Sequence, residues 1–156
     1  MNFRQELLED TVGSLPLRDA IIVHPYTVVR AAVARMRDLS IGCVVIVDYD
    51  QVPSGIFTEH SVIEVLMKNA SLDESPICEF ADPNFIVVEQ DEPILRVWEA
   101  VQLAAARFVC VTDSKGKALG ITGQRGLSEY LADCFAGQVA VQRLGSTPWM
   151  RQREGA

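Results

Sequence analysis

The sequence predicts an α+β fold in which one unit of strand, helix, strand, strand and helix is written twice. Residues 21–66 align with residues 86–131 without a gap, at an offset of 65 positions, and eight aligned pairs are identical. The apolar positions of the two segments also coincide, so both predict the same elements in the same order. Self-similarity of this kind decides the architecture, because each copy has to form the same supersecondary unit.

Length and charge limit the classes of protein to consider. A chain of 156 residues suits one compact domain or two small halves with a shared core. The formal net charge of −7 argues against nucleic acid as a partner, because nucleic acids are held by clustered Lys and Arg. No apolar run approaches the roughly 20 residues of a membrane span, and the chain starts with acids where a signal peptide carries bases. We therefore expect a cytoplasmic protein that binds neither membrane nor nucleic acid.

Each copy opens with a strand and a helix. The β-rich runs at residues 20–25 (AIIVHP) and 85–90 (FIVVEQ) predict short buried strands that end at turns. Apolar residues then recur at spacings of three and four, which predicts a helix with one buried face. Pro93 fits the first turn of the second helix, where its missing N–H is not needed. The predicted apolar faces consist of Val29, Ala32, Val33 and Met36 in copy one, and of Ile94, Val97, Trp98 and Val101 in copy two.

Each copy continues with a hairpin and closes with a second helix. Residues 43–57 (CVVIVDYDQVPSGIF) and 108–122 (FVCVTDSKGKALGIT) each predict two strands around an Asp-led polar turn. Gly116 marks the clearer of the two turns, since glycine adopts a positive φ without strain. The closing helices are predicted from the apolar residues Val62, Val65 and Leu66 and, in copy two, Leu127, Tyr130 and Leu131.

The repeat divides the chain into parts with different expected roles. We expect Ile77 and Phe80 to hold the connection between the copies to the core, and we predict no structure for the tail. Trp149 and Met150 in that tail suit either a segment that folds back or a docking segment for another chain. The expected parts are an N-terminal helical segment (1–11), a first repeat (12–68), a connection (69–83), a second repeat (84–135) and the tail (136–156).

The sequence contains little that indicates catalysis or metal binding. The four cysteines form no C-x-x-C pair and have no histidine at ligand spacing, so buried free thiols are expected and a zinc site is not. No motif places a nucleophile beside a base, and there are only two histidines. We therefore expect a protein that is not an enzyme and holds no metal.

Two matched motifs carry a resemblance to a known family. GIFTEHS at residues 55–61 and GITGQRG at residues 120–126 each follow the second hairpin strand and open a helix. Together with HPYTVVRAAVARM, IGCVVIVD and FVCVTDSKGKALGIT, they make the chain from about Val12 to Phe135 resemble a cystathionine-β-synthase (CBS) domain pair, or Bateman module. The resemblance implies two repeats packed through their sheets about a pseudo-twofold axis. It also implies two clefts that receive adenosine-type ligands such as AMP, ADP, ATP or S-adenosylmethionine.

The family motif, glycine–apolar–x–Ser/Thr–x–x–Asp, is only partly kept. Copy one has Gly55 and Thr58, with Ser61 in place of the aspartate that accepts from ribose hydroxyls. Copy two keeps the glycine and has Gly123 and Gly126 at the two later positions. We expect the cleft beside Thr58 to be the more readily occupied, because it retains a side-chain donor. The candidate ligand-binding residues are Cys43, Val44, Gly55, Thr58, His60, Ser61, Gly123 and Arg125.

Several of these residues have a second interpretation. Thr58 suits a plain helix N-cap, and Arg125 suits a solvated or carboxylate-paired side chain. Gly123 and Gly126 suit a place where a ligand or a partner's chain approaches the backbone closely.

Taken with the resemblance, the residues predict a stand-alone regulatory or sensor module that binds a small metabolite and modulates an effector protein. The resemblance also implies a homodimer. The alternative is a ligand-independent dimerisation and protein-docking scaffold with degenerate nucleotide sites.

Overall fold

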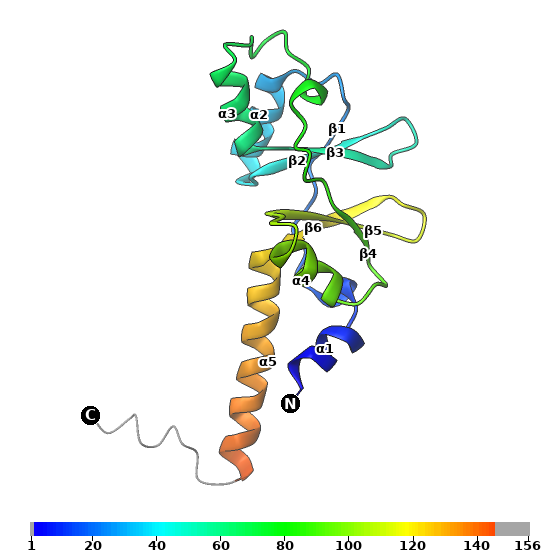
Figure 1. Cartoon of the computed structure of the whole chain (residues 1–156), viewed down its shortest axis with the longest axis vertical. Coiled ribbons are helices and arrows are strands. Elements are labelled where there is room, and N and C mark those ends of the chain that lie inside the picture. The colour runs from blue at the N-terminus through cyan, green and yellow to red at the C-terminus, as the bar shows by residue number, and fades with distance from the viewer. Residues whose placement is uncertain (1, 146–156) are drawn as a thin grey trace, which may run out of the picture.

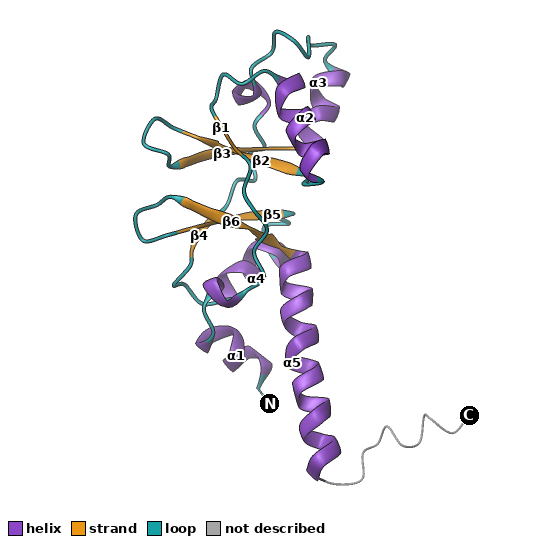
Figure 2. Ribbon diagram, turned by 180° about the vertical axis from the view of Figure 1, so that it is seen from behind, coloured by secondary structure: helices purple, strands orange, loops and turns teal. Residues whose placement is uncertain are grey.

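The repeated unit folds twice, into two three-stranded sheets that face each other with helices on their outer sides (Figures 1 and 2). The computed structural model describes residues 2–145. In each sheet the first strand is parallel and the third antiparallel to the central one. The strands are β1 (Ile22–Val23), β2 (Cys43–Val47) and β3 (Pro53–Thr58) in the first sheet, and β4 (Val87–Glu89), β5 (Phe108–Thr112) and β6 (Ala118–Gly123) in the second. The predicted α+β class and both hairpins are confirmed, with Gly116 at φ 81° in the second turn.

The helices cover the sheets as the apolar periodicity predicts, with three exceptions, of which one is Trp98 of copy two, expected in the buried face and 36% exposed. Val29, Ala32 and Met36 are buried under the first sheet, as Ile94 and Val97 are under the second. Leu66 and Leu131, expected in the buried faces, are 56% and 37% exposed. The helices are α1 (Phe3–Glu9), α2 (Val29–Leu39), α3 (Glu59–Met67), α4 (Leu95–Gln102) and α5 (Gln124–Gly145).

The N-terminal segment packs on the second half of the fold, and so do Val12 and Leu15, which were expected to belong to the first repeat. Val12 donates its N–H to the carbonyl of Glu92 at 2.8 Å, and Thr11 forms a β-bridge with Pro93. Pro93 lies before Ile94, the N-cap of a helix that begins at Leu95, so the prediction of Pro93 in the first helical turn is wrong. The buried Val12 and Leu15 pack in the core of the second repeat.

The connection takes the same place in the first half. Ile77 lies 65 positions after Val12 and donates its N–H to the carbonyl of Thr27 at 2.9 Å, and Pro76 bridges Val28. Ile77 and Phe80 are buried in the core of the first repeat, which confirms their predicted role. The repeat therefore extends beyond the aligned segments, and each half is completed by the segment that precedes the other half in the sequence.

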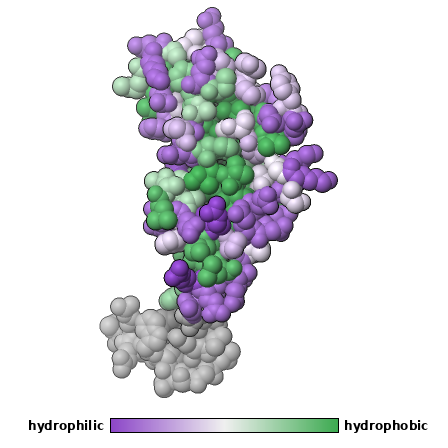
Figure 3. Space-filling model, turned by 45° about the vertical axis from the view of Figure 1, so that its right-hand side comes forward, coloured by the Kyte–Doolittle hydropathy of each residue, from purple (hydrophilic) through white to green (hydrophobic). Residues whose placement is uncertain are grey.

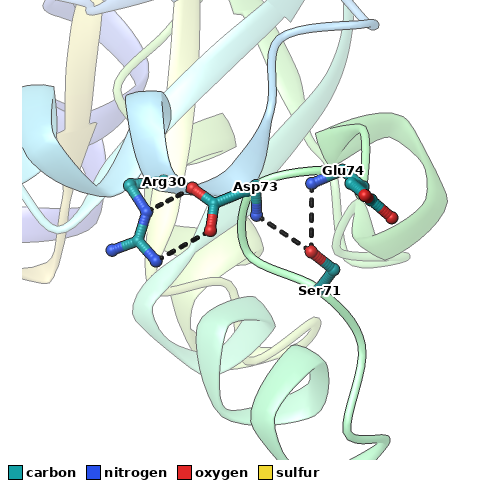
Figure 4. A network of polar contacts seen from close by, with 4 residues as sticks. All are labelled: Arg30, Ser71, Asp73 and Glu74. Atoms are coloured by element: carbon teal, nitrogen blue, oxygen red, sulfur yellow. Dashed lines mark hydrogen bonds and ion pairs between the residues drawn. The ribbon is translucent and has the colours of Figure 1, made fainter.

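An ion pair also ties the connection to α2 (Figure 4). The Arg30 guanidinium donates to both carboxylate oxygens of Asp73, and Ser71 Oγ accepts the N–H groups of Asp73 and Glu74 at 3.2 Å. The hydrogen bond from Arg30 holds the pKa of Asp73 below its ordinary value. The turn before Ile77 is thus held to the start of α2 from both backbone and side chain.

The two closing helices end differently. After α3, Asn69 adopts a left-handed φ of 52°, and the N–H groups of Asn69 and Ala70 return to the carbonyls of Leu66 and Val65. These bonds form a Schellman motif, which ends the helix. The aligned residue in copy two is Cys134, and α5 continues past it to Gly145 and projects beyond the repeats (Figure 1). The expected boundary at residue 135 therefore falls inside a helix; Trp149 and Met150 lie outside the described residues.

The core of the two sheets contains two of the cysteines. Cys43 and Cys110 are fully buried, and burial raises the pKa of Cys43 to about 12 and that of Cys110 to about 11. Both thiols stay protonated at neutral pH and pack as apolar groups. Cys78 is exposed and Cys134 is half-buried, so the expectation of buried free thiols holds for two of the four cysteines.

Candidate ligand-binding clefts

Two cavities lie at matched positions where the two repeats meet. The larger, of about 270 Å³, lies beside GITGQRG and is called here the second cleft. The smaller, of about 90 Å³, lies beside GIFTEHS and is called the first cleft. Ligand pockets usually have at least about 300 Å³, so the second cleft is the closer to that range. Its lining residues are Pro16, Leu17, Arg18, Ile41, Arg107, Phe108, Ile121, Thr122, Gly123, Arg125, Gly126 and Glu129.

Both halves of the molecule build the second cleft. Arg18, in the segment before β1, exchanges two backbone hydrogen bonds with Ile121 of β6, at 2.9 and 2.8 Å. This pairing holds the Arg18 side chain beside β6, where its Nη2 donates to the carbonyl of Ser40 at 2.9 Å. Phe108 and Arg107 come from the start of β5, and Arg125 from the first turn of α5.

The second cleft is positively charged in an acidic protein. Arg18, Arg107 and Arg125 line it, and Glu129 is the carboxylate among its lining residues. Arg125 Nε lies 3.1 Å from Glu129 Oε1, so the predicted alternative of a carboxylate-paired Arg125 is confirmed. That pair is largely exposed, and exposed ion pairs are weak, so Arg125 can still turn to an anion in the cleft.

A buried hydroxyl in the second cleft has no partner. Thr122 is 5% exposed, lines the cavity, and its Oγ1 makes no hydrogen bond among the described residues. A Cβ added at Gly126 would lie 2.3 Å from this Oγ1 and 3.2 Å from the carbonyl oxygen of Pro16. The position at which the family carries an aspartate is therefore closed to any side chain while Thr122 keeps this rotamer.

Gly123 is required by the protein's own backbone. A Cβ at this position would lie 2.4 Å from the carbonyl oxygen of Arg107, the residue directly before β5, the strand paired with β6. The close approach expected at Gly123 and Gly126 is thus made, in this structure, by neighbouring segments of the same chain.

The hydroxyls of the first motif are used within the helix. Thr58 Oγ1 accepts the N–H of Ser61 at 3.3 Å, and Ser61 Oγ accepts the N–H of Thr58 at 3.1 Å. This reciprocal pair is a capping box, and it confirms Thr58 as the N-cap of α3. Ser61 is 2% exposed and does not line the first cleft, whose lining residues are Ile56, Thr58, His60, Asp82, Asn84, Ala105, Arg107 and Phe108.

Two residues of the second repeat narrow the first cleft. A Cβ at Gly42 would lie 3.0 Å from Phe108 Cζ, so the Phe108 ring fills the space that Gly42 leaves. The Arg107 guanidinium lies 5.3 Å from the centre of that ring and pairs with Glu59, with Nη1 and Oε2 3.3 Å apart. Arg107 and Phe108 line both clefts.

The predicted site residues are divided between the clefts and the core. Thr58 and His60 line the first cleft, and Gly123 and Arg125 line the second. Cys43, Val44 and Gly55 are buried in the first sheet and line neither, because their side chains or backbone face the core packing.

Sequence reasoning missed Arg18, Arg107 and Thr122. Arg107 aligns with Gly42 and Arg18 with Pro83, so the repeat itself does not mark these arginines. Thr122 stands directly before Gly123 in the motif, and its β-branched side chain had been assigned only to the strand. The two arginines were missed because the cleft is assembled from segments that lie far apart in the sequence, and Thr122 because the burial of its hydroxyl beside the cleft depends on the packing.

Residues 2–145 contain neither a candidate metal site nor a candidate membrane span. No group of three His, Cys, Asp or Glu side chains there is arranged to hold a metal ion. No helix of this part of the chain is long and apolar enough to cross a membrane.

Comparisons with known proteins agree with this architecture. A family model described as CBS domain matches residues 12–68. An uncharacterized protein of Methanopyrus kandleri is 34% identical over 115 residues, which is 71% of this chain and 57% of that protein. The chain thus spans little more than half the length of this relative.

Solved structures share the fold at low identity. A CBS domain protein from Pyrobaculum aerophilum complexed with AMP has 18% identity and a TM-score of 0.68, over 75% of this chain and 89% of the other. The CBS domain pair of protein MJ0100, in complex with 5′-methylthioadenosine and S-adenosyl-L-methionine, has 22% identity and a TM-score of 0.69, over 79% and 96%. A CBS-domain containing protein from Agrobacterium tumefaciens has 22% identity and a TM-score of 0.65, over 77% and 97%. The family model places a CBS domain at residues 12–68. The matched structures show that the chain has the fold of a tandem CBS domain pair.

Proposed function

We propose that the protein is a regulatory module that binds an adenosine-type metabolite in the second cleft and thereby changes how it acts on a partner protein. The observation that carries this proposal is the cavity of about 270 Å³ with three arginines and an unpartnered, buried Thr122 hydroxyl. Structures of related fold hold AMP or S-adenosyl-L-methionine, which supports an adenosine-type ligand.

The second cleft offers separate surfaces to the parts of such a ligand. Leu17, Ile121 and the Phe108 ring provide apolar surface for a purine. Arg18 and Arg125 provide fixed positive charge for phosphate, which guanidinium groups bind through paired N–H donors. The Thr122 hydroxyl is free to bond a polar group of the ligand, which would remove the cost of a buried, unpaired oxygen. The proposal therefore places the ligand at GITGQRG, whereas the motif alone favoured the cleft beside Thr58.

The position of α5 provides a route from the ligand to a partner. The helix begins in the second cleft at Gln124 and Arg125 and ends beyond the repeats (Figure 2). A ligand that bonds the first turn of α5 and the Arg18 segment together restricts the motion of that helix relative to the first repeat. A partner that contacts the projecting half would detect this change.

Thermal unfolding with AMP, ADP, ATP and S-adenosylmethionine tests the proposal. A ligand at 100 times its dissociation constant should add about 2.7 kcal/mol to the free energy of unfolding. Arg125→Gln should weaken binding of the phosphate ligands by about tenfold, because it removes a charged donor to phosphate. Arg37→Gln, which removes the same charge from the exposed end of α2, is the matched control. The absence of a shift with all four ligands at millimolar concentration would exclude the adenosine-type ligand.

A second candidate function, a ligand-independent dimerisation and docking scaffold, is favoured by one surface. Ile63, Leu66 and Met67 on α3 are 55%, 56% and 78% exposed, and they form an apolar face away from the sheet. Hydrophobic residues also remain at the surface elsewhere, as the face in Figure 3 shows. A second copy of the chain seated on α3 would bury these side chains and produce a homodimer.

Light scattering of the purified protein tests this surface. We expect Leu66→Lys to weaken dimerisation by about 30-fold, equivalent to about 2 kcal/mol, because it places a charge at the centre of the buried face. Leu119→Lys, at an exposed position on β6, should leave the mass unchanged. A wild-type mass equal to one chain, at a protein concentration on the order of 100 micromolar, would contradict the dimer. A dimer whose thermal unfolding is not shifted by any ligand would favour the scaffold.

A further inference from the structure

Arg107 occupies a position that the two clefts share. It lines the second cleft together with Arg18 and Arg125, and it also lines the first cleft. Among the described residues that line the first cleft, Arg107 is the one Lys or Arg side chain, and Asp82 there carries the opposite charge. An anion in the first cleft would depend on Arg107, whereas an anion in the second cleft has two further arginines.

The present partner of Arg107 holds it weakly. Its ion pair with Glu59 has an N–O distance of 3.3 Å, and the two side chains are 70% and 58% exposed. Exposed pairs of this kind contribute little to stability, because water screens them and ordering two long side chains costs entropy. A phosphate carries more charge than one carboxylate and accepts paired N–H donors, so it competes well for the guanidinium.

Glu59 links this pair to the first repeat. It is the first residue of α3 and belongs to the GIFTEHS motif. Its carboxyl carbon lies 3.4 Å from where a Cβ of Gly42 would be, so the ion pair joins the start of α3 to the residue directly before β5, close to Gly42. Movement of Arg107 therefore changes the charge at the first cleft as well as at the second.

We propose that Arg107 is the shared anion-recognising residue of the two clefts, so that each chain binds one anionic ligand, in the second cleft, and releases Glu59 when it does. This inference rests on the proposed function and specifies the stoichiometry and the charge selectivity of that site. Once Arg107 bonds a phosphate in the second cleft, the first cleft keeps Asp82, and the carboxylate of Glu59, which lies in the chain between the lining residues Thr58 and His60, is left unpaired. Both charges repel a second anion. Release of Glu59 also removes an ion pair from the N-terminus of α3 when the second cleft is occupied.

Isothermal titration calorimetry with AMP and with uncharged adenosine tests the proposal. For the wild-type protein we expect one AMP per chain. Arg107→Gln should weaken AMP binding by about tenfold and leave adenosine binding within about twofold, because only the phosphate contact is lost. Glu59→Gln should tighten AMP binding by about threefold, since it removes the competing carboxylate. Arg37→Gln is the control for loss of one positive charge, and thermal melts of each variant check that it folds.

The outcomes separate this inference from the proposed function. Two AMP molecules per chain with similar affinities would overturn the sharing of Arg107 while leaving an adenosine-type ligand in place. Equal losses of AMP and adenosine affinity in Arg107→Gln, or no gain in Glu59→Gln, would show that Arg107 acts only through the shape of the cleft. No binding of AMP to the wild-type protein at millimolar concentration would overturn the proposed phosphate ligand, and the shared residue with it.

Discussion

Replacement of Gly123 by alanine is expected to lower the free energy of unfolding by about 3 kcal/mol, the upper part of the range for an overpacked interior. The added Cβ would lie 2.4 Å from the carbonyl oxygen of Arg107. This oxygen belongs to the backbone directly before β5, and Phe108 pairs with Gly123 across the sheet, so neither strand can shift alone. Urea unfolding monitored by circular dichroism measures the change in midpoint.

Gly55→Ala is the matched control, since this glycine is also buried in a third strand. A Cβ there would meet Ile46 Cδ1 at 3.5 Å and Ala81 Cβ at 3.6 Å, which are ordinary contacts. We expect its stability to change by no more than about 0.5 kcal/mol. Equal unfolding midpoints for the two variants would contradict the tight packing described at Gly123. The expected difference would show that the backbone packing at Gly123 leaves no room for a side chain.

Replacement of Ile77 by alanine is expected to cost about 3 kcal/mol, although this residue lies in the connection between the repeats. Its side chain is fully buried in the core of the first repeat, and its N–H bonds to the carbonyl of Thr27. Truncation would leave a cavity that the surrounding strands and helices cannot fill. The same urea unfolding measurement gives the size of the effect.

Cys78→Ala provides the control for Ile77, because the neighbouring cysteine is exposed and makes no core contact. We expect the urea midpoint of Cys78→Ala to equal that of the wild-type protein within experimental error. If Ile77→Ala were as stable as Cys78→Ala, the connection would be a linker only, and the completion of the first repeat by residues 72–83 would be disproved.

The local elements could be read from the sequence because short-range patterns specify them. The hairpins follow from β-rich runs around the turns at Asp48 and Asp113, and the helices follow from apolar residues three and four positions apart. The motif at Thr58 was also partly readable: a hydroxyl before a helix predicts an N-cap, and the structure contains one.

The candidate site could be predicted only in part. The motifs marked the places where the two clefts lie, since both open at a helix N-terminus. Arg125 lies in the motif, but the other two arginines of the second cleft come from outside it: Arg18 from a segment that pairs with β6, and Arg107 from the residue before β5. A pattern within the second repeat cannot predict a cleft residue such as Arg18, which lies before the first repeat's β1 in the sequence.

The sequence by itself determined the duplicated unit, the order of its elements and the resemblance to a CBS domain pair, because each depends on periodicity and on residues close together in the chain. The tertiary structure decided which segment completes each half, where α5 ends and which cleft has room for a ligand. These features depend on contacts between residues far apart in sequence, such as Thr11 with Pro93 and Gly126 with Thr122. For that reason GIFTEHS, the better preserved motif, caps its own helix, while the altered GITGQRG lies beside the larger and more positively charged cavity.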